Sequence, residues 1–215
     1  MASHRDEIRT VSYRLLRARP GTTRLWTIQP LGVWERLFRE RSLLVDPCHE
    51  AFSQDFRAAY DWMRGQMAER LPGYRGHYPW WAYDYRLDLR SFRHQVAPGD
   101  YVLLGLAVPT ERVLFSAYGA WHSVLNGDYL PQSTDEPEYD QESEDWDEEL
   151  RCAGLNRYGG GILPEPWRSR VVSSWKRIFD VEDLRETNTI QACFERLDLA
   201  EVVEMKQFSA ALHEK

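Results

Sequence analysis

Two polar side chains that can exchange protons or hydrogen bonds directly follow a long apolar stretch, residues 101–121. These are His122 and Asn126, which are four residues apart. If the chain turns into a helix there, this spacing places both side chains on one face. An imidazole can take up or release a proton near neutral pH, and an amide can hold a ligand by hydrogen bonds. The pattern therefore predicts His122 as a catalytic acid or base and Asn126 as a ligand contact, although the same spacing suits a purely structural hydrogen bond.

A second set of polar residues lies near the end of the chain. Apolar and polar residues alternate over 189–197, which predicts a strand with one buried face. Ile190, Ala192 and Phe194 share the predicted inner face, and the outer face carries Gln191, Cys193 and Glu195. Because every second residue of a strand points the same way, Gln191 and Glu195 are expected to reach the same ligand.

Aromatic and charged residues that suit a flat, anionic ligand lie between these sets and the N-terminus. Residues 77–85 contain five Tyr and Trp side chains, and Trp80 and Trp81 could stack on a nucleobase, a nicotinamide or a sugar face. Filling the edge of the core is the alternative role for these rings. Arg90 follows shortly and could contact a phosphate, or it could pair with Asp88 two residues away.

Local patterns indicate the elements that would position these residues. Residues 24–29 alternate as a strand does, a helix is predicted from residue 31 to 41, and apolar residues recur at helical spacing over 52–67 and 167–179. The two apolar runs within 101–121 are predicted to pair as antiparallel strands across a proline-containing turn. This order does not alternate as a parallel fold would. It predicts an α+β domain, with a twisted, mainly antiparallel sheet and three to four packed helices.

Length and composition favour one domain. The chain has 215 residues, 43% of them hydrophobic, which is enough for one substantial core. Residues 1–22 are predicted to be a flexible extension and residues 23–215 the domain. Within it, residues 127–149 are predicted to be a mobile loop, because ten acidic residues lie between Asp135 and Glu149 with few apolar ones. This acidic loop could be a solvated insertion, a lid or a surface for a basic partner.

Charge and composition also exclude several classes of protein. The net charge of −7 comes from the acidic segment, and no block of Lys or Arg gives a strong nucleic-acid signal. No apolar run is long enough to cross a membrane, and the N-terminus lacks the apolar core of a signal peptide. The three cysteines are widely spaced, so no metal site is expected. A cytoplasmic location is predicted.

Several short motifs resemble a bacterial family of unassigned function. They are Leu-Trp-Thr-Ile-Gln at 25–29, Pro-Trp-Trp at 79–81, Asp-Leu-Arg at 88–90, Trp-His-Ser-Val-Leu-Asn at 121–126 and Ser-Trp at 174–175. More remotely, the opening strand and helix and the strand that begins at Gln191 are similar to the frame of ADP-ribosyltransferase-like domains.

The remoter resemblance implies a split barrel, NAD as a substrate and particular roles for strand residues. In those enzymes the first strand presents a His or Arg to the dinucleotide, and a late strand presents a catalytic Glu. Here Thr27 stands at the first position and Cys193 at the second, so Glu195 is the nearest substitute on the same predicted face. Thr27 and Gln29 are then expected to line the ligand site.

Three functions from different classes agree with these patterns. The first is a nucleotide-linked transferase with Glu195 and His122 as catalytic residues. The second is a non-catalytic regulator that binds a nucleotide, a peptide or a protein, which the missing basic residue and Glu favour. The third is a small biosynthetic enzyme that uses His122 without NAD. Trp81, Arg90, His122, Gln191 and Glu195 are predicted to converge on one cleft.

Overall fold

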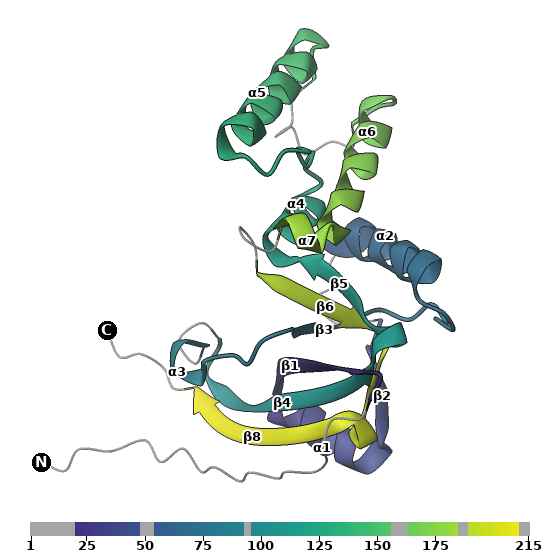
Figure 1. The fold of residues 1–215 in the computed structure, drawn as a ribbon, viewed down its shortest axis with the longest axis vertical. Coiled ribbons are helices and arrows are strands. Elements are labelled where there is room, and N and C mark those ends of the chain that lie inside the picture. Colours follow the sequence, from purple (N-terminus) through teal and green to yellow (C-terminus); the bar gives the residue numbers. More distant parts are fainter. Residues whose placement is uncertain (1–19, 48–53, 93–95, 156–162, 185–188, 211–215) are drawn as a thin grey trace, which may run out of the picture. The chain divides into compact units, whose positions relative to one another are not determined.

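The computed structural model describes residues 20–47, 54–92, 96–155, 163–184 and 189–210 (Figure 1). Most of the predicted N-terminal extension lies outside the described residues. The chain divides into two compact units. Unit 1 comprises residues 1–47, 66–114 and 192–215, and unit 2 comprises residues 48–65 and 115–191.

Unit 1 is built on four neighbouring strands. They are β1 (Thr22–Pro30), β3 (Trp80–Tyr83), β4 (Gly99–Pro109) and β8 (Val202–Ala210), in the order β3-β1-β4-β8. Figure 1 shows β4 between β1 and β8, and it pairs antiparallel with both. Residues 102–108 are all buried, as expected for a continuous apolar run in a central strand covered on both faces.

The helix that follows β1 begins and ends close to the bounds predicted for it, residues 31 and 41. Helix α1 (Leu31–Glu40) starts directly after Pro30, which needs no N–H at a helix start. It ends at Arg41, where a left-handed backbone conformation (φ 68°) lets the Arg41 N–H donate to the Leu37 carbonyl at 2.9 Å. Next come β2 (Ser42–Leu44) and, much later, β7 (Arg196–Asp198), which pair as a small separate antiparallel sheet.

The long helix α2 (Gln54–Arg70) contributes residues to both units. Its predicted apolar stripe is fully buried at Met63 and Met67, whereas Phe56 remains 37% exposed. The stripe therefore anchors the second half of the helix more firmly than the first.

Unit 2 is mainly helical. Its helices are α4 (Tyr118–Asn126), α5 (Glu136–Cys152), α6 (Trp167–Ser174), the 3-10 helix η3 (Trp175–Phe179) and α7 (Val181–Leu184). Trp175 is buried in unit 2. Its indole N–H donates to the Asp128 carbonyl at 2.7 Å, and its ring lies edge-on to that of Trp62, with ring centroids 5.5 Å apart. The predicted apolar face of this segment is thus core.

The six-stranded sheet has the order β5-β6-β3-β1-β4-β8, where β5 is Leu114–Ala117 and β6 is Ile190–Phe194. This confirms the α+β class and the mainly antiparallel sheet, with seven α-helices among the described residues and no closed barrel there. The predicted pairing of the two central apolar runs is wrong, because β4 and β5 are not neighbours. Strands β1 and β8 already occupy both edges of β4, and the 3-10 turn η2 (Thr110–Arg112) leads the chain away.

Residues 127–149 were predicted to form an acidic loop, but most of this segment forms helix α5. The Asp135 side chain caps the helix by accepting the Glu138 N–H, and acidic residues in the first turn suit the positive end of the helix dipole. Trp146 and Leu150 are buried, and Trp146 stacks on Tyr129 at 4.6 Å. Two buried apolar side chains four residues apart thus anchor a helix whose composition indicated a loop.

Candidate functional site

Unit 1 contains a pocket of about 360 Å³ at one end of its sheet, which we call the Arg90 pocket. Two segments line it. One is the stretch from Arg86 to Arg90, which leads into the short helix α3 (Leu89–Phe92), and the other is the last part of β8, with Lys206, Phe208 and Ser209.

The floor of the Arg90 pocket is apolar and well packed. Leu87, Leu89 and Phe208 are buried and form one cluster with Leu103 of β4. Tyr101 stacks on Phe208 with 5.7 Å between ring centroids, which holds that ring in place. A ligand would therefore meet a preformed apolar surface.

Positive charge surrounds this floor. Arg86 donates to the Glu204 carboxylate at 2.7 Å, so its charge is compensated. Neither the Arg90 side chain nor the Lys206 side chain has an ion pair with a described residue. The Asp88 carboxylate accepts the Arg90 backbone N–H at 2.9 Å and forms no ion pair with the Arg90 guanidinium. Two cationic side chains thus remain available for an anion.

A second pocket of unit 1, of about 320 Å³, contains Glu195 and is called the Glu195 pocket. The loop of residues 71–77, together with Leu44, Arg112 and Arg196, completes its lining. The Glu195 carboxylate accepts the backbone N–H of Arg75 at 2.9 Å and that of His77 at 3.0 Å. Both bonds fix the loop, so Glu195 has a structural role whether or not it also meets a ligand.

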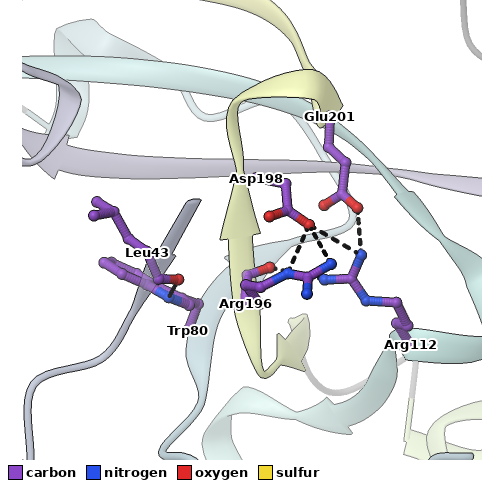
Figure 2. A network of polar contacts seen from close by, with 6 residues as sticks. All are labelled: Leu43, Trp80, Arg112, Arg196, Asp198 and Glu201. Carbon is purple, nitrogen blue, oxygen red and sulfur yellow. Dashed lines mark hydrogen bonds and ion pairs between the residues drawn. The ribbon is translucent and has the colours of Figure 1, made fainter. Parts of the chain in front are cut away.

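Arg112, which lines the Glu195 pocket, also joins two carboxylates (Figure 2). It pairs with Glu201 of the 3-10 helix η4 (Leu199–Glu201) and with Asp198 at 3.4 Å, and it also donates to the Arg196 carbonyl at 3.0 Å. One Glu201 oxygen is buried and has no hydrogen-bond partner among the described residues. Burial raises the pKa of Glu201 to about 7, although the Arg112 charge opposes this shift.

Trp80 and Trp81 follow one another in β3 and therefore point to opposite faces of the strand. The Trp80 indole N–H donates to the Leu43 carbonyl at 3.1 Å, which ties β3 to β2 (Figure 2). A single flat ring could not stack on both tryptophans, and neither lines the Arg90 pocket or the Glu195 pocket. The geometry favours the alternative role that the sequence left open for them, packing at the edge of the core.

Thr27 and Gln29 share one face of β1, and they contact each other. The Gln29 amide donates to the Thr27 hydroxyl at 2.8 Å, and Thr27 is buried. The neighbouring side chains Trp26 and Ile28 point to the other face and pack against the floor of the Arg90 pocket. Thr27 and Gln29 are therefore on the sheet face away from Arg90.

The prediction that the outer face of strand β6 is exposed is wrong for two of its residues. Gln191 and Cys193 are buried, like every residue of β6, because this strand lies inside the sheet between β5 and β3. Gln191 donates to the Ser116 hydroxyl at 3.3 Å in place of water or a ligand. Burial also raises the pKa of the Cys193 thiol well above its ordinary value, so the thiol stays protonated.

Helix α4 places His122 and Asn126 as the sequence predicted, on one exposed face. Nδ1 of His122 lies 2.9 Å from the Tyr118 carbonyl oxygen. Because a carbonyl can only accept, Nδ1 carries the proton, and Nε2 of the neutral ring is then an acceptor. The His122 ring also contacts the edge of Tyr118, with centroids 4.6 Å apart.

The predicted site residues are thus distributed over several places. Arg90 and Glu195 line different pockets near opposite ends of β4, roughly 25 Å apart by the rise of a strand. His122, Asn126 and Gln191 belong to unit 2, and convergence of the two groups stays a prediction. Sequence reasoning missed Lys206 and Phe208, which lie two residues apart on one face of β8 but more than 100 residues from Arg90 in the chain.

A family model matches residues 24–203, which include the lining of the two pockets of unit 1 except Lys206, Phe208 and Ser209 of β8. The chain belongs to the family named domain of unknown function DUF3841. Comparison of the chain with curated proteins and with solved structures gave no match. Membership of the DUF3841 family agrees with the motif resemblance, which pointed to a family without an assigned function.

Within the described part of this DUF3841 chain, no group of three or more His, Cys, Asp and Glu side chains is arranged to hold a metal ion. The helices that the structure describes are also too short or too polar for any of them to span a bilayer.

Proposed function

We propose that unit 1 binds a phosphate-bearing small molecule of the nucleotide class in the Arg90 pocket. The observation that carries this proposal is the pair of cationic side chains, Arg90 and Lys206, beside an apolar floor and without carboxylate partners among the described residues.

Size and chemistry favour a nucleotide over a simple anion. A volume of about 360 Å³ lies within the range of small-molecule sites, about 300–1,000 Å³. The floor of Leu87, Leu89 and Phe208 suits a flat ring, and the forked Arg90 guanidinium suits a phosphate. Glu204 holds Arg86 in place, so this side chain shapes the wall and adds little net charge.

Calorimetric titration of the full chain tests the proposal. The ligands are ATP, ADP, NAD, adenosine and inorganic phosphate. We expect at least one nucleotide to bind, and adenosine and phosphate alone to bind more weakly, because each has only half of the recognised groups. Arg90→Gln and Lys206→Gln should each weaken nucleotide binding about tenfold or more, as loss of a charge-assisted hydrogen bond does.

Arg39→Gln is the matched control, because Arg39 is an exposed arginine of α1 that lies outside the pocket and has no ion pair with a described residue. It should leave binding unchanged. If no nucleotide binds, or if the Arg90 and Lys206 variants bind as the parent does, the Arg90 pocket is not the site.

Catalysis by a nucleotide-linked transferase extends this proposal. The likeness to ADP-ribosyltransferases, the bacterial origin of the family and the roles of Glu195 and His122 remain predictions. The two backbone N–H groups that engage Glu195 favour the non-catalytic regulator over the transferase. The transferase would instead be favoured if the parent consumes NAD and Glu195→Gln does not, although the variant binds NAD with unchanged affinity. The biosynthetic alternative predicts a turnover that depends on His122 and needs no NAD.

A further inference from the structure

Unit 2 contains a pocket that the proposed function does not use, with a volume of about 330 Å³. It lies among α4, the first turn of α5, η3, α7 and the extended segment of residues 130–134. We call it the Arg177 pocket. Its polar lining includes hydroxyl groups and two side chains of opposite charge, Arg177 and Glu136.

The walls of the Arg177 pocket are held in place by hydrogen bonds from both sides. The Leu130 N–H donates to the Ser174 hydroxyl of α6 at 2.9 Å. The Glu142 carboxylate of α5 accepts the backbone N–H groups of Gln132 at 2.6 Å and Ser133 at 3.1 Å. The segment between α4 and α5 is therefore a fixed wall, and the pocket is formed without a ligand.

The two charges that line this pocket do not pair with each other. Other charged residues of α5 form ion pairs, such as Glu149 with Arg170 and Glu148 with Arg151. Arg177 and Glu136 line the same cavity, yet neither has an ion pair or a side-chain hydrogen bond with any residue that the structure describes. A positive and a negative group are thus held apart across one space.

We propose that the Arg177 pocket binds a free α-amino acid, with the carboxylate at Arg177 and the ammonium group at Glu136. A guanidinium group binds a carboxylate through two parallel hydrogen bonds, and a carboxylate accepts from an ammonium group. The hydroxyls of Ser123 and Thr134 also have no hydrogen-bond partner among the described residues and can supply the remaining hydrogen bonds. Ala120, Leu130 and Leu184 give the amino acid's side chain an apolar surface.

A nucleotide does not suit this pocket, because Glu136 and the acidic face of α5 repel a multiply charged anion. A zwitterion carries no net charge and places one charge against each protein group. This ligand class separates the Arg177 pocket from the Arg90 pocket, so failure of either proposal leaves the other standing.

Calorimetric titration of the full chain with the twenty L-amino acids tests the inference. For the amino acid that binds best, the titration is repeated with its methyl ester, which lacks the carboxylate, and its N-acetyl form, which lacks the ammonium group. We expect each derivative to bind at least about tenfold more weakly, since each loses a charge-assisted hydrogen bond. This comparison needs no variant and so does not depend on a variant's folding.

Two substitutions then assign the charges. Arg177→Gln should abolish the preference for the free acid over the ester, and Glu136→Gln should abolish the preference for the free amine over the N-acetyl form. Arg168→Gln and Glu144→Gln are matched controls at exposed positions of α6 and α5 outside the pocket, and both should keep the two preferences. Absence of binding by every amino acid, equal binding of the derivatives, or preferences that survive both pocket substitutions would each overturn the proposal.

Discussion

Glu201 makes the stability of unit 1 depend on pH in a direction opposite to that of most carboxylates. Burial raises its pKa from 4.5 to about 7, so the folded protein holds the proton more tightly than the unfolded chain does. Its contribution to the free energy of unfolding is therefore complete below pH 4.5, falls as the pH rises from 4.5 to 7, and stays low above pH 7. Neutralising this one carboxyl group should stabilise the fold at pH 8.

The structure bounds the size of this effect. The full difference between the two pKa values corresponds to roughly 3 kcal/mol. The Glu201 side chain is still 12% exposed and Arg112 pairs with it, so water and the guanidinium group relieve part of the charge burial. We therefore expect the contribution of Glu201 to the free energy of unfolding to fall by about 1 to 2 kcal/mol between pH 5 and pH 8.

Urea unfolding of the parent and of Glu201→Gln at pH 5 and pH 8 measures it, because the glutamine has the same shape and no titration. From pH 5 to pH 8, the free energy of unfolding of the parent should fall by about 1 to 2 kcal/mol more than that of the variant. The pH dependence due to other titrating groups is the same in both proteins and cancels in the comparison. Glu111→Gln, an exposed position beside Arg112, is the control and should follow the parent. If the parent and Glu201→Gln show the same pH dependence, the carboxyl group of Glu201 is not buried as a charge.

Three other predictions concern the same fold. Trp175→Ala should lower the free energy of unfolding by about 3 to 5 kcal/mol, because a buried ring and its hydrogen bond are lost, and a variant as stable as the parent in urea would contradict the packing of unit 2. Replacement of residues 132–149 by a Gly/Ser linker should lower the melting temperature by several degrees, because helix α5 buries two large apolar side chains, whereas an unchanged melting temperature would restore the loop interpretation. Glu195→Gln should destabilise the protein by about 1 to 2 kcal/mol, because a carboxylate that accepts two backbone N–H groups is replaced by a neutral amide; a stable variant without ligand binding or activity would instead favour a purely catalytic role.

Elements with strong local signals could be predicted from the sequence. The alternation of residues 24–29 and the proline after them predicted β1 and the start of α1, because strand polarity and helix entry are decided within a few residues. The continuous apolar run at the start of residues 101–121 predicted a buried strand, and β4 is that strand. The spacing of His122 and Asn126 predicted their shared face on α4 for the same local reason.

Local pattern was not sufficient where partners distant in sequence decide the structure. Helix α5 has the composition of a loop, and it docks because Trp146 finds Tyr129 and Arg170 in other segments. Gln191 occupies a position that alternation predicts to be outward, yet Ser116 of β5 satisfies its amide inside the sheet. A polar side chain can be buried when tertiary structure supplies its hydrogen bond, and alternation does not show this.

The candidate pockets depend on tertiary structure most of all. The sequence by itself determined that Arg90 follows an aromatic segment and that a carboxylate follows the late strand. Only the antiparallel pairing of β4 with β8 brings Lys206 and Phe208 to the segment around Arg90, because strand register joins residues that are far apart in the chain. Tertiary structure also places Arg90 and Glu195 in different pockets near opposite ends of β4, and residues that far apart cannot meet at one ligand.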